Sequence, residues 1–194
     1  MGALERGMLK ALEKYIVDLA GKNVAGRVME GSEQIARATD KRRIAEWVKG
    51  AIERLDSSVD ENVRVQIMEN CGRNCAEVHK GMMNRARARR KKYENESEFL
   101  EAEQRRPAKG TKLLREGDML YQVYTPRAFS RPVRCYCSIL RGLPAEETIS
   151  PTYCQCSKGF VKKFWETVLG RPVEVDLIQS AVSGADECKF AIHL

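Results

Sequence analysis

Three pairs of cysteines have the residue type and spacing best suited to a chemical role, such as metal binding or catalysis. The chain has seven cysteines among 194 residues, and six of them fall in closely spaced pairs. Residues four apart on a helix, or two apart on a strand, project from the same face. Each pair can therefore offer two thiols to a common point, for Cys154 and Cys156 if their segment is extended. The pairs are Cys71 with Cys75, Cys135 with Cys137, and Cys154 with Cys156.

Metal coordination is the first chemistry that such pairs indicate, because thiolates are preferred zinc ligands. We predict a zinc site that Cys71 and Cys75 hold from a helix, with an iron–sulfur cluster as the minor alternative. His79 lies one further turn along that helix and could add a ligand. Arg73 is the candidate to stabilise thiolate charge or to bind an anionic ligand, and its alternative role is a surface cation. The candidates for the remaining metal ligands are Cys135, Cys137, Cys154 and Cys156.

Buried core thiols are the alternative interpretation, because cysteine packs as a small apolar residue. Cys71 and Cys75 continue the apolar stripe of Val63 and Ile67 on their predicted helix. A third interpretation is a redox pair formed by Cys154 with Cys156. Cys188, which alternates with apolar neighbours, is predicted to lie in the core.

An enzyme is the second functional hypothesis. A thiolate or a metal-bound water could hydrolyse a C–N or C–S bond of a small molecule. His79 stands four residues after Cys75, so a Cys–His pair is conceivable, although such spacing arises readily by chance. No GxSxG, HExxH or phosphate-binding glycine loop is present in the sequence.

The basic charge of the chain is concentrated in one segment. The formal net charge is +7, and residues 80–92 contain seven Lys and Arg residues and no acid. This stripe predicts either the solvated end of a long helix or, as a further functional alternative, a contact with nucleic acid. No aromatic residue precedes Tyr93 in the stripe, so a stacking platform for single strands is not indicated.

The first half of the chain has helical periodicity. Apolar residues recur every three or four positions from Leu4 to Leu19, over 24–38 and over 41–55. Ser58 and Glu61 have the spacing of a capping box for a fourth helix, which we expect to continue through the basic stripe to about residue 92. Residues 93–106 are predicted to be helical as well.

After Gly110 the period at which apolar residues recur changes from 3.6 residues, typical of a helix, to two, typical of a strand. We predict strands over 118–125, 131–140, 172–182 and 187–194, and a short helix over 157–169. The predicted fold class is α+β, with a helical N-terminal half packed on a four- to five-stranded antiparallel sheet. We expect a helical region, 1–106, and a ligand-binding-like region, 107–194, folded together as one domain.

Composition excludes several classes of protein. No stretch approaches the roughly 20 apolar residues of a membrane span, so no membrane partner is predicted. Charged residues interrupt the first 22 positions, where a secretory signal would need an apolar run. We therefore expect reduced thiols and a cytoplasmic location. The pattern specifies no oligomeric state.

The C-terminal 40 residues resemble a known family. The shared features are a Cys before a Gly-Phe helix (Cys156, Gly159, Phe160), a GRPVEV strand, and a hairpin with Gly184, Asp186, Cys188 and Phe190. This pattern is similar to the 4-vinyl reductase type of small-molecule-binding domain, which belongs with the haem nitric-oxide-binding and trafficking-particle folds. Ser180 stands where that family often has a further Cys.

A second resemblance rests on Cys71, Gly72, Arg73 and Cys75 together with the C-terminal stretch. These residues are similar to uncharacterised proteins related to the L-2-amino-thiazoline-4-carboxylic acid hydrolase family. The resemblances imply a small-molecule ligand as partner. The leading hypothesis is thus a small-molecule-binding domain with a cysteine-ligated metal, with the hydrolase and nucleic-acid binding as alternatives.

Overall fold

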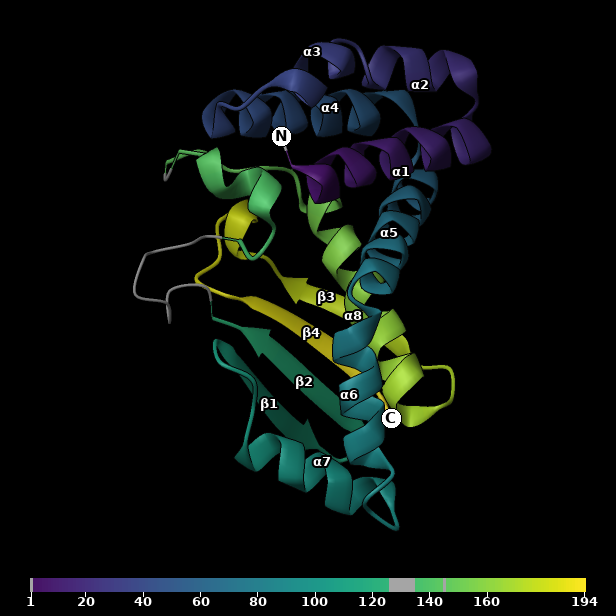
Figure 1. Ribbon diagram of the computed structural model, residues 1–194, viewed down its shortest axis with the longest axis vertical. Coiled ribbons are helices and arrows are strands. Elements are labelled where there is room, and N and C mark those ends of the chain that lie inside the picture. The colour runs from purple at the N-terminus through teal and green to yellow at the C-terminus, as the bar shows by residue number, and fades with distance from the viewer. Residues whose placement is uncertain (1, 126–134, 145) are drawn as a thin grey trace.

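The structure is a computed structural model that describes residues 2–125, 135–144 and 146–194. Its helices and strands follow the predicted order, helices first and then the sheet (Figure 1). The α-helices are α1 (Ala3–Ala20), α2 (Lys22–Val28), α3 (Ser32–Arg37), α4 (Lys41–Ser58), α5 (Glu61–Val78), α6 (Lys80–Arg90), α7 (Glu96–Arg105) and α8 (Gln155–Leu169). The strands are β1 (Thr111–Glu116), β2 (Met119–Tyr124), β3 (Glu174–Gln179) and β4 (Cys188–His193). Short 3-10 helices span Ser138–Gly142, Pro151–Cys154 and Ala181–Ser183.

The four strands form one antiparallel sheet in the order β1-β2-β4-β3. Figure 1 shows α1 to α4 gathered at one end of the molecule and α7 at the opposite end beside β1, with α5 and α6 between them; α5 and α6 both pack against α8. The predicted α+β class, with a helical N-terminal half and a four-stranded antiparallel sheet, is confirmed.

Two buried cores hold these layers together. The first unites α1, α2, α4 and α5 with the 3-10 helices, around Ile16, Leu55 and Ile67. The second packs α8 onto the sheet, around Trp165 and Phe190. The apolar stripes predicted from the 3.6-residue period supply the first core, because each helix can bury only one face.

Two glycines allow α5 and α8 to cross closely between the cores. A Cβ at Gly72 would overlap the carbonyl oxygen of Cys156, and a Cβ at Gly159 would overlap the carbonyl oxygen of Glu69. Only glycine permits this approach of two helix backbones. The CGRNC and CQCSKG segments therefore meet face to face, although they are about 80 residues apart in the sequence.

Several boundaries differ from the predictions for physical reasons. The long fourth helix breaks at His79 into α5 and α6, and its N-cap is Asp60, whose side chain accepts from the amide of Val63 at 3.0 Å. The helix over 24–38 is two helices, separated where Gly31 adopts a φ of 77°. The helix over 157–169 starts two residues earlier, at Gln155.

The strand predicted over 131–140 is wrong in its described part. Residues 135–137 form no strand and Ser138–Gly142 is a 3-10 helix, while 131–134 lie outside the described residues. Ile139 and Leu140 are both buried against α4. Adjacent residues can face one core from a helical turn, but not from a strand, where they alternate.

One strand, β1, was not predicted. It pairs with β2 through a two-residue turn at Gly117 and Asp118, with Gly117 at a φ of 60°. Its side chains are exposed or half-buried along its length, so its apolar alternation is weak. The Gly-Asp dipeptide is the signal that could have located this hairpin.

Candidate functional site

A large cavity opens beside the sheet, between α6, α7, α8 and the strands β1 and β2. Its volume is about 1010 Å³. Pockets for small organic ligands typically measure about 300–1,000 Å³ and combine apolar walls with a few polar groups. The size of this cavity therefore suits a whole small molecule rather than a single ion.

Aromatic side chains form its inner wall. Phe164 and Trp165 of α8 stack edge to face, with ring centroids 5.3 Å apart. Trp165 is 1% exposed, and its Nε1 donates a hydrogen bond to the Oε1 of Gln122 at 2.8 Å. This bond satisfies the one polar group of a buried indole and holds the ring in place. The aromatic residues that line the cavity are Tyr93, Tyr124, Phe160, Phe164 and Trp165.

Tyr124 adds a neutral hydroxyl to this wall. Burial, and to a lesser extent the neighbouring Tyr136 and Cys188, raise the pKa of the Tyr124 phenol. Its ring also lies 5.4 Å from the ring of Phe190 in an edge-to-face contact. The phenol is therefore protonated near neutral pH, and its hydroxyl can donate or accept a hydrogen bond.

The rim of the cavity is charged, and its arginines are not equivalent. Arg89 of α6 donates two hydrogen bonds to Glu103 of α7, at 2.8 and 2.7 Å. Arg105 pairs with Glu101 at 3.2 Å within α7. Arg85 and Arg106 also line the cavity, and neither has an ion pair with any described residue.

The predicted metal ligands lie around the crossing of α5 and α8, away from this cavity's lining. Burial raises the pKa of Cys71 and of Cys154 to about 12, and it raises the pKa of Cys156 well above its ordinary value. Electrostatic repulsion by the neighbouring thiols raises the pKa of Cys156 further; these neighbours are Cys71, Cys75, Cys137 and Cys154. The chain thus brings thiols from all three pairs into one buried neighbourhood, and all seven cysteines are free of disulfides.

Two of these clustered cysteines, Cys137 and Cys154, have hydrogen-bond partners in the structure. Tyr153 Oη donates to Cys137 Sγ at 3.1 Å, and Cys154 Sγ lies 2.8 Å from Ser180 Oγ. Burial raises the pKa of Cys135 and of Cys137 as well. Cys188 lies apart in the second core, as predicted, and accepts from the amide of Ala181.

No metal-binding arrangement is present among the described residues. Over 2–125, 135–144 and 146–194, no three Cys, His, Asp or Glu side chains are grouped so that they could hold a metal ion. The assignment of zinc or an iron–sulfur cluster to Cys71, Cys75, Cys135, Cys137, Cys154 and Cys156 stays a prediction.

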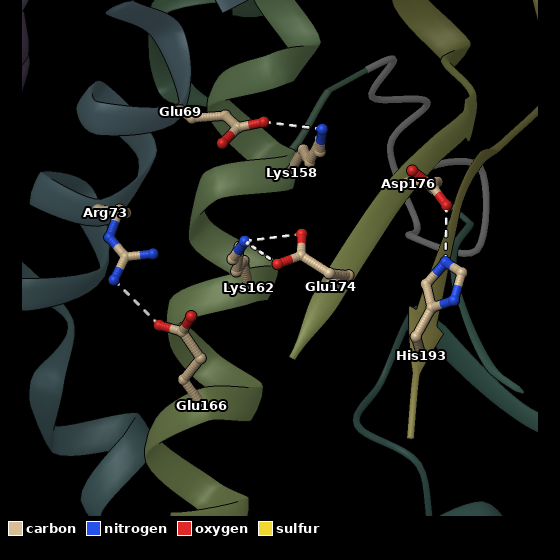
Figure 2. A network of polar contacts seen from close by, with 8 residues as sticks. All are labelled: Glu69, Arg73, Lys158, Lys162, Glu166, Glu174, Asp176 and His193. Atoms are coloured by element: carbon tan, nitrogen blue, oxygen red, sulfur yellow. Dashed lines mark hydrogen bonds and ion pairs between the residues drawn. The ribbon is translucent and has the colours of Figure 1, made fainter. Parts of the chain in front are cut away.

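Arg73 forms an ion pair rather than standing free. Its Nη2 lies 3.0 Å from Glu166 of α8 (Figure 2). Two further pairs, Glu69 with Lys158 and Glu77 with Lys163, connect the same two helices at 2.7 and 3.0 Å. These contacts fix α5 against α8 on their outer side. A role of Arg73 in ligand binding stays a prediction.

The basic stripe is divided among several structural roles. Arg89 pairs with Glu103, and Arg90 donates to the carbonyl oxygen of Tyr93 at 3.0 Å. Arg85, Arg87 and Lys91 are all exposed, and of these three Arg85 lines the cavity. Its charge is therefore dispersed and does not form one uniform face.

The residues that line the cavity were not identified as a site from the sequence. Phe160, Phe164 and Trp165 fit the apolar face of a helix, and the arginines fit a solvated stripe. The i, i+4 spacings of Arg85 with Arg89 and of Phe160 with Phe164 are signals that each set shares one helix face. The sequence contains no signal that the two faces enclose a common space.

No described helix is long and apolar enough to cross a membrane. Among curated proteins, no sequence matches the chain. Among solved structures, the chain is similar to that of an H-NOX protein from S. oneidensis in the Fe(II)NO ligation state. The TM-score is 0.44 and the sequence identity 12%, over 97% of this chain and 98% of that one. A family model matches residues 6–194, which is nearly the whole sequence, and the chain therefore belongs to the family of unknown function DUF6144.

Proposed function

We propose that this protein binds a small organic molecule in the cavity between α6, α7, α8 and the sheet. The observation that carries the proposal is the aromatic wall of a 1010 Å³ cavity, held rigid by the bond between Trp165 and Gln122. An apolar or aromatic ligand body would replace water against the half-buried rings of Phe160 and Phe164. Burial of apolar area stabilises such a complex by about 25 cal/mol per Å² before the costs of association.

A neutral fluorescent probe tests this proposal without assuming the natural ligand. N-phenyl-1-naphthylamine brightens in apolar surroundings and carries no charge. We expect it to bind the wild-type protein and to bind the Ala102→Phe variant at least about tenfold more weakly, a difference of about 1.4 kcal/mol. Ala102 lines the cavity, and the larger ring would take up part of its space.

Ala88→Phe is the matched control. Ala88 is exposed on α6 and is not part of the cavity lining, so this variant should bind the probe as the wild type does. Circular dichroism and urea unfolding would confirm that both variants fold. Equal probe affinity of the two folded variants would refute binding in the cavity.

As a second candidate, we propose that the thiols around the α5–α8 crossing take a thiophilic metal such as zinc. Thiols of all three pairs pack in or against the first core, with Cys71 and Cys154 buried in it and Cys137 and Cys156 against it, and this supports the candidate. Cys75 is half-buried one helical turn from Cys71. Binding would require deprotonation of thiols whose pKa is raised, so bound metal would release protons.

Metal content after purification under reducing conditions tests the second candidate. We expect about one zinc per chain, lost on substitution Cys75→Ser and retained on Cys188→Ser. Zinc-free wild-type protein that also fails to bind added zinc would exclude it. The hydrolase alternative is less favoured in its thiolate form, because a nucleophilic cysteine needs a lowered pKa and the pKa of each thiol here is raised.

A further inference from the structure

Two arginines on the cavity rim have no charged partner among the described residues, and this indicates the chemistry of the ligand. Four arginines line the cavity, and the two carboxylates of Glu101 and Glu103 neutralise Arg105 and Arg89. Arg85 and Arg106 remain, without an ion pair to any residue that the structure describes. The Arg89–Glu103 pair connects α6 to α7 and the Arg105–Glu101 pair lies within α7, whereas Arg85 and Arg106 offer unused donors.

The remaining acid of the lining does not cancel this excess. Glu98 lies in the first turn of α7, and Arg106 directly follows the last residue of that helix. At a rise of 1.5 Å per residue, Glu98 stands about 10 Å along the helix axis from the end that carries Arg106. The cavity therefore has a cationic and an acidic end on α7, with Arg85 entering from α6.

The guanidinium groups fit a particular kind of anion. Arginine presents its N–H donors in a planar fork that matches the oxygens of a carboxylate, a phosphate or a sulfonate. A ligand that combines an apolar body with one oxyanion would satisfy both parts of the lining.

Resting on the proposed function, we infer that the ligand of this cavity is an organic acid whose oxyanion is bound by Arg85 and Arg106, with its aromatic or apolar body against α8. This inference assigns a role to part of the basic stripe. It also explains why Arg85 is left unpaired while Arg89, one turn later on the same helix face, is bound to Glu103.

A pair of probes that differ only in charge tests the inference. 8-Anilinonaphthalene-1-sulfonate has the body of N-phenyl-1-naphthylamine with one added sulfonate. We expect the wild-type protein to bind the sulfonate at least tenfold more tightly. The double variant Arg85→Gln/Arg106→Gln should lose this preference and keep its affinity for the neutral probe.

The control removes the same charge from the stripe outside the cavity. Arg87→Gln/Lys91→Gln should retain the preference for the sulfonate, because neither residue lines the cavity. An equal loss in this control would show a general surface field and would overturn the inference. So would an unchanged preference in the Arg85/Arg106 variant.

Competition then separates the sources of the oxyanion. 1-Naphthoate and 1-naphthyl phosphate share an aromatic body and differ in their oxyanion. Displacement of the sulfonate probe by one of them, with weaker displacement by the other, supports the inference and identifies the preferred oxyanion. Failure of both to compete would contradict it. If the neutral probe binds in the cavity but no anion is preferred, the inference fails and the proposed function stands; if the neutral probe does not bind there, the proposed function fails.

Discussion

The indole Nε1 of Trp165 donates to the amide Oε1 of Gln122 at 2.8 Å, and this bond joins α8 to β2, one of the two central strands. Both residues line the cavity and both are buried. The pair is therefore a structural support of the candidate site as well as part of its wall. It replaces the water that the indole N–H would otherwise need.

Gln122→Leu should destabilise the protein by about 1–3 kcal/mol, because it leaves the buried indole N–H without an acceptor. Urea unfolding measures the loss from the shift of the midpoint at constant slope. Gln66→Leu, at an exposed position of α5, should change the free energy of unfolding by less than about 0.5 kcal/mol. Similar effects of the two substitutions would show that the hydrogen bond is not important for stability.

The close crossing of α5 and α8 predicts that Gly72 tolerates no side chain. Gly72→Ala should cost about 1–3 kcal/mol or more, since the added methyl overlaps the carbonyl oxygen of Cys156 and forces the helices apart. Gly26→Ala in α2 meets no atom within 4 Å and should instead stabilise by about 0.5–1 kcal/mol. Thermal unfolding of the two variants should thus shift in opposite directions, and a stable Gly72→Ala protein would contradict the crossing.

The raised thiol pKa values predict a loss of stability at alkaline pH. The ordinary pKa of a cysteine thiol is 9.0, and burial raises that of Cys71 to about 12. Above pH 9 the unfolded chain releases a proton that the folded protein keeps, so the free energy of unfolding falls as pH rises from about 9 towards 12. Each such thiol contributes a slope of up to about 1.4 kcal/mol per pH unit.

Cys71→Ala should remove one thiol's share of this slope between pH 9 and 10.5, as measured by urea unfolding at several pH values. Ile67→Val, a truncation of another buried side chain of α5, should lower stability at every pH and leave the slope unchanged. An identical slope in wild type and Cys71→Ala would mean that this thiol ionises in the folded state as it does in the unfolded one.

Asn95 caps α7, the helix that carries most of the charged rim. Its side-chain oxygen accepts from the amide of Glu98 at 2.9 Å. Asn95→Ala should cost about 1 kcal/mol, which corresponds to about fivefold faster hydrogen exchange in the first turns of α7 if they open locally. Asp60→Ala, which removes the cap of α5, should leave exchange in α7 unchanged. Equal exchange in α7 for wild type and Asn95→Ala would show that another contact holds this end.

The local pattern of the chain was sufficient for its class and for most of its elements. Apolar residues at spacings of three and four predicted the helices, and alternation after Gly110 predicted β2, β3 and β4, because burial of one face imposes a period on the sequence. The pattern was insufficient for β1, whose side chains bury little, and for Ser138–Gly142, where two adjacent residues face the core. In both cases tertiary contacts, not periodicity, select the conformation.

Both candidate sites depend on contacts between segments that are distant in the sequence. The two sites differ in how much of each could be predicted from the sequence. The spacing of the cysteines indicated three pairs of thiols. It could not indicate that Gly72 and Gly159 bring two of those pairs to one helix crossing. The cavity could not be predicted from the sequence. Arg85 on α6, Arg106 after α7 and Trp165 on α8 line one cavity only because three helices pack around the sheet. A residue's type and its local face are properties of a few neighbouring positions, whereas enclosure and charge pairing are set by which surfaces the whole chain buries against one another.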